Sequence, residues 1–286
     1  MKIQNKFIRY IIYALIAAVV AVALYFYLGF FGNPISKLLC KNTAEKYVAA
    51  NYPECHVERW GYNFKDGNYF ANIQKEGSPD TYFFVYTDWL GNLKYDSYES
   101  YVTSGHNTTN RMMMEYRAVL DSALPQESVD YTLDIFYGDI LCNGSYEKYV
   151  WDENPEKIVA IPREDIVIDG QYDYSELGYK YGYICLYVND EDVSVDRACE
   201  ILLDVKEKLN KNGIGFYYID FVLTLPRDAD GTPNDDERRI NIELFRWDDI
   251  YEEGLADRVQ TAHDELTAYY AKMDAQKTAE MKAAEN

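Results

Sequence analysis

The chain has 286 residues, of which 28 are basic and 48 acidic, so its formal net charge is −20 at pH 7. A surface this acidic repels the phosphates of nucleic acids and of anionic lipid headgroups, so we expect no nucleic-acid partner. The five cysteines include no Cys-x-x-Cys pair, and their odd number fits buried free thiols at least as well as a disulfide framework.

The first element is an uninterrupted apolar run that begins at Ile11 and ends at Phe31. A helix of this length reaches about 31 Å, close to the roughly 30 Å of hydrocarbon in a bilayer, which predicts a single membrane-spanning helix. Three alternatives are a signal peptide cleaved after Ala23, a lipoprotein anchor at Cys40 and a buried core helix. Apolar residues continue past Ala23, a bulky leucine precedes Cys40, and the run has no polar face, so each alternative is disfavoured.

Positive charge is concentrated on the N-terminal side of this run. The basic residues before it are Lys2, Lys6 and Arg9, and those that follow it closely are Lys37 and Lys41. The positive-inside rule therefore predicts that residues 1–10 are cytoplasmic and that the bulk of the chain is extracytoplasmic. Residues 32–41 are expected to form a linker.

The first folded unit is predicted over residues 42–125. Asn42 and Glu45 have the spacing of a capping box, which marks the start of a helix. Strand-like segments follow, and Asp66-Gly67 between two of them supplies the positive φ angles of a tight hairpin. The unit should therefore be a helix on an antiparallel meander.

Two runs in this unit carry a family resemblance: YNFKDG at residues 62–67 and YTDWLGNLKYD at residues 86–96. With them, the anchor and residues 42–102 resemble the YfjL-like membrane-anchored proteins of Gram-positive bacteria. More distantly, they are similar to the helix-plus-meander of PepSY-type domains. The YfjL-like resemblance implies no catalytic residue and no assigned activity, and some PepSY-type members are associated with the regulation of extracytoplasmic peptidases.

A second unit is predicted over residues 126–250, followed by a C-terminal helix and tail over residues 251–286. Alternating tyrosines predict a strand over residues 178–188, and Ser194 should cap a helix that ends near Gly213. Segments 216–225 and 239–245 should form a hairpin. The predicted fold class is therefore α+β, with one N-terminal transmembrane helix followed by two helix-on-antiparallel-sheet units.

One segment has the spacing of a catalytic pair. Ser145 and Lys148 are separated as in the Ser-x-x-Lys hydrolases, in which the lysine activates the serine. The accompanying motifs of those enzymes are missing, and Asn143-Gly144-Ser145 is more simply a turn. Ser145 and Lys148 are therefore catalytic candidates with a simpler structural explanation.

The acidic loop between residues 228 and 237 is the segment most like a metal site. Its calcium candidates are Asp228, Asp230, Asn234, Asp235 and Asp236. Such oxygen ligands suit Ca²⁺, but Gly231 comes too early for an EF-hand and no glutamate follows at the required offset. A solvated hairpin turn explains the loop better, and we expect neither a metal nor a cofactor.

The leading functional prediction is a non-enzymatic extracytoplasmic binding or regulatory protein, whose partner is an envelope protein or peptide. The 29 tyrosines fit half-buried sheet faces better than a glycan- or peptide-binding surface. The alternatives are a membrane-tethered hydrolase, which uses Ser145 and Lys148 or a carboxylate pair, and an accessory subunit of a membrane complex. A deep cleft with convergent polar groups would favour the enzyme, and an exposed sheet edge or apolar patch the binding protein.

Overall fold

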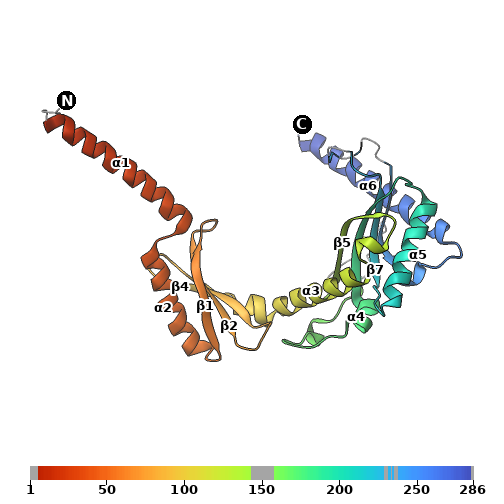
Figure 1. Ribbon diagram of the computed structural model, residues 1–286, viewed down its shortest axis with the longest axis horizontal. Helices are drawn as coiled ribbons and strands as arrows, with labels where there is room; N and C mark the ends of the chain where they lie inside the picture. Colours follow the sequence, from red (N-terminus) through yellow and green to blue (C-terminus); the bar gives the residue numbers. More distant parts are fainter. Residues whose placement is uncertain (1–5, 143–157, 229–230, 233, 235–237, 285–286) are drawn as a thin grey trace. The chain divides into compact units, whose positions relative to one another are not determined.

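The structure is a computed structural model that describes residues 6–142, 158–228, 231–232, 234 and 238–284. Its residues form two compact units, Met1–Thr108 and Thr109–Asn286. Each unit combines helices with a four-stranded sheet, so the predicted α+β class is confirmed (Figure 1).

The first unit starts with two helices, α1 (Lys6–Phe31) and α2 (Pro34–Asn51). From residue 8 to residue 31 every side chain of α1 is exposed, and the helix extends away from the sheet (Figure 1). Among the described residues, α1 leads the one helical segment that is long and apolar enough to cross a membrane. Most of its apolar surface therefore has no partner within the part of the chain that the structure describes.

The second helix starts earlier than its capping-box pattern indicates. Asn33 is the N-cap and its side chain accepts a hydrogen bond from the Ile35 N–H at 2.8 Å, while Pro34 occupies the first turn. Proline has a fixed φ angle and no N–H, both of which suit this position. Residues 34–41 are therefore helix, where we expected a linker.

Sheet A of the first unit is wholly antiparallel, with the strand order β1-β2-β3-β4. Its strands are β1 (Cys55–Asn63), β2 (Asn68–Lys75), β3 (Tyr82–Thr87) and β4 (Leu93–Asp96). The β1–β2 hairpin turns at Asp66-Gly67 as predicted, and Gly67 has a φ of 70°. The helix α2 covers one face, where Ala44 and Val48 pack in a core with Phe83 and Val85.

Sheet B of the second unit has the order β5-β6-β7-β8. The strands are β5 (Thr132–Ile140), β6 (Gly182–Asn189), β7 (Tyr218–Thr224) and β8 (Arg239–Arg246). The α-helices are α3 (His106–Ala123), α4 (Tyr174–Tyr181), α5 (Val195–Lys211) and α6 (Leu255–Ala284). Short helical turns occur at Glu99–Thr103, Gln126–Ser128, Arg163–Asp165 and Trp247–Asp249.

This second sheet is mixed, whereas the sequence predicted an antiparallel one. β6 and β7 are parallel because α5 connects them and returns the chain to the end of the sheet at which β6 begins. The predicted hairpin of β7 and β8 is present and antiparallel. The strand expected over residues 178–188 starts only at Gly182. The residues just before it form α4, which has Asp173 as its N-cap and ends at Tyr181.

One face of sheet B carries the core of the second unit. Ile184, Leu186 and Phe221 are fully buried there, together with Tyr116 and Leu120 from α3. Residues 109–125 were assigned to the first unit, but these contacts bring α3 into the second core. The sequence shows that α3 has an apolar stripe, but it does not show which of the two sheets this stripe covers.

Candidate functional site

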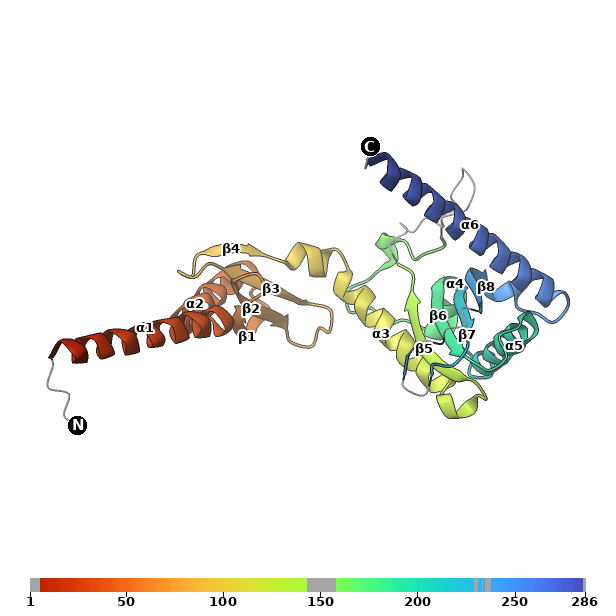
Figure 2. The ribbon, with the colours of Figure 1, turned by 90° about the horizontal axis from the view of Figure 1, so that it is seen from above.

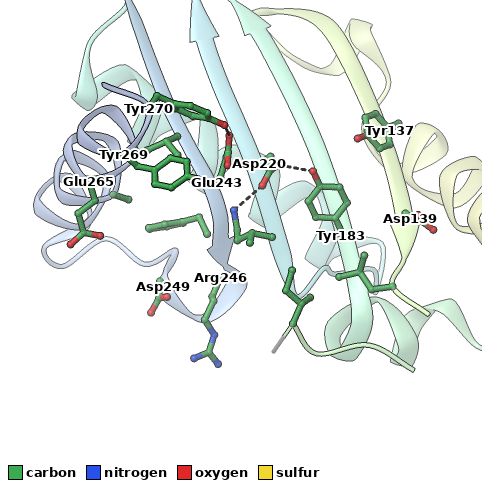
Figure 3. A pocket seen from close by; sticks show the side chains of 16 residues that line it. Tyr137, Asp139, Tyr183, Asp220, Glu243, Arg246, Asp249, Glu265, Tyr269 and Tyr270 are labelled. Atoms are coloured by element: carbon green, nitrogen blue, oxygen red, sulfur yellow. Dashed lines mark hydrogen bonds between the residues drawn. The ribbon is translucent and has the colours of Figure 1, made fainter. Parts of the chain in front are cut away.

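The other face of sheet B is polar and aromatic. Side chains alternate between the two faces of a strand, so the residues that separate the core positions point away from the core. They include Tyr137 and Asp139 on β5, Tyr183 on β6, Asp220 on β7 and Glu243 on β8. Each of the four strands therefore contributes a polar group to this face (Figure 3).

A pocket of about 640 Å³ lies on this face. Strand β8 contacts α6, and residues 262–270 of α6 form one wall (Figures 2 and 3). The lining residues are Tyr137, Asp139, Leu141, Ile158, Tyr183, Asp220, Glu243, Leu244, Phe245, Arg246, Asp249, Ala262, Glu265, Leu266, Tyr269 and Tyr270. This volume falls within the range of roughly 300–1,000 Å³ that is usual for small-molecule sites.

A β-bulge in β8 shapes the floor of the pocket. Ile219 pairs with Phe245 and Phe221 pairs with Ile242, so two residues of β8 stand opposite Asp220. One of them, Leu244, has a φ of 51°, which is rarely adopted by a residue other than glycine. This geometry turns the Leu244 N–H out of the strand ladder, and it donates a hydrogen bond to Asp220 Oδ1 at 2.7 Å.

Asp220 receives a second donor on its other oxygen. The Tyr183 hydroxyl donates to Oδ2 at 2.5 Å (Figure 3). Burial raises the pKa of Asp220 above its usual range, although both hydrogen bonds oppose that rise. Burial and the nearby Asp220 also raise the pKa of Tyr183, which therefore stays a neutral donor.

Two further carboxyl groups of the pocket, those of Glu243 and Asp139, interact with their surroundings in different ways. Tyr270 on α6 donates to Glu243 Oε1 at 2.8 Å, and this bond raises the pKa of Tyr270 to about 12. Burial raises the pKa of Asp139 on β5. The strands thus place carboxyl groups around the pocket, and the α6 wall supplies a hydrogen-bond donor to one of them.

The charge of the pocket is strongly unbalanced. The described residues that line it include five carboxyl groups, from Asp139, Asp220, Glu243, Asp249 and Glu265, and one guanidinium, from Arg246. That guanidinium lies 3.5 Å from an Asp248 oxygen and 5.3 Å from the centre of the Tyr217 ring, and neither residue lines the pocket. The site therefore favours a cation.

Cys185 lies on the same face but is not a reactive group. It is buried, and burial together with Asp220 raises the pKa of its thiol to about 11. A thiol with this pKa is almost wholly protonated at neutral pH, and so is a poor nucleophile. All five cysteines are free, and four of them are buried.

Most of the residues singled out from the sequence are not among those that the structure describes. Ser145 and Lys148 fall outside the described residues, as do Asp230, Asp235 and Asp236 of the acidic loop. At the start of that loop the Gly231 N–H donates to the Asp228 carbonyl at 2.8 Å, as in a turn, while the Asn234 amide lies 3.5 Å from the Pro226 carbonyl. Within the described ranges no group of three or more His, Cys, Asp or Glu residues is placed to hold a metal ion.

Sequence reasoning did not find the pocket residues. The acids come from β5, β7, β8, the helical turn Trp247–Asp249 and α6, and no fixed spacing links them. One local signal exists, because Asp220 is the single charged residue in the apolar strand Tyr218–Thr224. A lone acid inside a buried strand is unusual unless it has partners or a function.

Comparison with known families covers both units. Residues 7–97 match the YfjL-like N-terminal domain, and residues 115–260 match the YfjL-like C-terminal domain. The chain belongs to the YfjL-like family. The resemblance seen in the first unit thus extends to the second, and strands β5 to β8 lie within the C-terminal domain, whereas Glu265, Tyr269 and Tyr270 lie beyond the match.

Other comparisons add little. None of the curated proteins matches the chain. A solved structure, described as a DUF5037 family protein from Ruminococcus gnavus, aligns with 65% of this chain and 74% of its own at 14% identity. Its TM-score is 0.19, which is too low to support an argument about fold or function.

Proposed function

We propose that this YfjL-like protein is a non-enzymatic binding protein, anchored in the cell membrane, whose second unit binds a cationic group of a peptide or envelope protein. The observation that carries the proposal is the pocket on sheet B, with five carboxyl groups and several tyrosine rings around about 640 Å³. Carboxylates accept hydrogen bonds from an ammonium or guanidinium group, and tyrosine faces attract a cation. A lysine or arginine side chain therefore suits the site.

The membrane part of the proposal rests on α1 and on the distribution of charge. The helix is exposed along its apolar length, and basic residues are concentrated before it. The N-terminus is then cytoplasmic, and the two units lie outside the cytoplasm. In this orientation the pocket is available to proteins and peptides of the cell envelope.

The test is calorimetric titration of the full chain, in nanodiscs of zwitterionic lipid, with Nα-acetyl-lysine methylamide. We expect saturable binding that weakens with salt, and no binding of the same compound acetylated on its side-chain nitrogen. Glu243→Gln keeps an acceptor for Tyr270 but removes a charge, and it should weaken binding roughly tenfold, the cost of one charged hydrogen bond.

The matched control is Glu191→Gln, which removes one exposed carboxylate that does not line the pocket. Its affinity should equal that of the unchanged protein. Equal binding of both compounds, or an equal loss in both variants, would contradict a cation site in this pocket.

A second candidate function is a membrane-tethered hydrolase that uses carboxyl groups. It is favoured by the raised pKa of Asp220 next to Glu243, since acid–base catalysis uses carboxyl groups in different environments. Both oxygens of Asp220 already accept hydrogen bonds, however, which suits a fixed charge better than a proton carrier. Hydrolysis of cell-wall peptides or glycans that Asp220→Asn abolishes and Glu191→Gln preserves would establish the enzyme.

A further inference from the structure

Two turns of the first unit lie at the same end of sheet A. Consecutive strands are antiparallel, so the β1–β2 turn at residues 64–67 and the β3–β4 turn at residues 88–92 lie at the same end of the strands. Their large apolar side chains are exposed: Phe64 by 56%, Trp89 by 65% and Leu90 by 53%. Isolated exposed apolar residues are common, but a group at one end of a unit indicates a contact surface.

The anchor helix is joined to this same end. The rings of Phe30 and Phe64 lie 6.0 Å apart, which places the first turn beside the last residues of α1. The second turn contacts α2, where the Thr43 hydroxyl donates to the Gly91 carbonyl at 2.6 Å. A Cβ on Gly91 would lie only 2.7 Å from Leu39 Cβ, so this turn is packed closely on the helix.

The connection between anchor and unit is short and fixed. Gly32 and Asn33 are the two residues that separate α1 from α2, and two residues span about 7 Å at most. Gly32 has a φ of 71°, and a Cβ there would lie 2.5 Å from the Tyr62 ring. The Asn33 N–H also donates to the Tyr69 hydroxyl at 2.9 Å, so the end of α1 is held against sheet A.

The start of α2 continues the exposed apolar group. Ile35 and Leu38 are both exposed on its first turns, and Lys37 lies between them. The nearby Lys41 ammonium lies 4.4 Å from the centre of the Trp60 ring. Aromatic and apolar side chains flanked by lysines are typical of residues at a membrane–water interface, where lysine reaches the headgroups.

We propose that this end of the first unit is a lipid-contacting surface, formed by Phe64, Trp89, Leu90, Ile35 and Leu38. The surface lies in the headgroup region of the leaflet from which α1 emerges. The occupant is the bilayer rather than another protein, because the two-residue connection keeps these side chains beside the membrane end of α1. This inference rests on the proposed anchoring by α1 and adds that the first unit lies on the membrane.

The test measures quenching of tryptophan fluorescence in the full chain, reconstituted in phosphatidylcholine nanodiscs whose acyl chains are brominated near the headgroup. Trp89→Phe should remove a large part of the quenching, because the exposed Trp89 ring lies among the brominated lipids. Trp247→Phe in the second unit is the matched control and should leave the quenching by brominated lipids unchanged. Acrylamide in the water should quench Trp89 weakly.

Two other results would overturn the inference. If acrylamide quenches Trp89 strongly and brominated lipid does not, this end of the unit is in water. If neither agent reaches Trp89, a protein covers it, such as a second copy of the chain. Retention of the protein in the discs after alkaline extraction tests anchoring separately, so a chain that is retained but has an unquenched Trp89 contradicts this inference alone.

Discussion

Asp220 shows how one residue connects the fold to the pocket. Its carboxyl group is held by a hydroxyl from β6 and by a backbone N–H from β8, so three neighbouring strands meet at one side chain. Both donors stabilise the charged form, yet burial outweighs them and raises its pKa. The cost of burying this charge is a cost to stability, which makes it measurable without a ligand.

Asp220→Asn should flatten the pH dependence of unfolding. The folded pKa lies above the unfolded value of about 3.9, so the folded protein binds more protons between the two values. Stability of the unchanged protein therefore falls as pH rises from about 4 through the folded pKa, by about 1.4 kcal/mol for each unit of difference. Denaturant titrations of the full chain from pH 4 to pH 8 measure this slope. The slope should persist in Glu191→Gln, and its persistence in Asp220→Asn would assign it to another group.

At the scale of the element, α5 determines how sheet B is built. It makes β6 and β7 parallel, and its start is tied to the end of β6 through Arg197. The Arg197 guanidinium lies 2.8 Å from an Asp190 oxygen, with Asp130 and Glu200 at 3.0 and 3.1 Å. The Ser194 hydroxyl caps the helix by accepting a hydrogen bond from the Arg197 N–H at 3.2 Å.

Ser194→Ala should lower the free energy of unfolding by about 1 kcal/mol, the usual cost of losing an N-cap. Ser194→Asp keeps an acceptor at the cap and adds a negative charge at the helix N-terminus, so it should retain most of the stability. Chemical denaturation of the full chain, followed by circular dichroism, compares the three proteins. Equal destabilisation by alanine and aspartate would mean that the loss of stability does not come from the missing cap acceptor.

Local chemistry made some elements predictable from the sequence. The Asp66-Gly67 hairpin and the Ser194 cap depend on residues close together in the chain, and both are present. The start of β6 was predicted too early, because Tyr179 and Tyr181 of α4 continue the tyrosine alternation of the strand. The parallel pair was missed because β6 and β7 are separated by a whole helix. The pocket was missed for the same reason, since Asp139, Asp220 and Glu243 converge only through strand pairing.

At the scale of the whole molecule, the chain combines an apolar helix with two separate cores. The first core contains Phe83 and Val85, and the second contains Phe221 and Leu186. All the acidic residues of the chain come after α1, while three of its basic residues come before residue 10. This asymmetry is the basis for the proposed orientation.

Protease treatment of intact cells tests that orientation. A tag at the N-terminus should be protected until the cells are lysed, whereas a tag at the C-terminus should be removed from intact cells, because the proposed orientation places the units outside the cytoplasm. Replacement of Lys2, Lys6 and Arg9 by glutamine should weaken this preference, since positive charge sets the side. Digestion of the C-terminal tag only after lysis would reverse the assignment.

The bulge in β8 has a consequence for variation within the family. The core positions Ile242 and Phe245 keep their inward orientation because the additional residue between them is absorbed by the bulge. Deletion of Leu244 alone would restore regular pairing without turning any core side chain outward, but it would remove the N–H that Asp220 accepts. A relative one residue shorter at this point should therefore also lack the acid at position 220. The length of a single strand would then separate family members that keep an acidic pocket from those that keep only the fold.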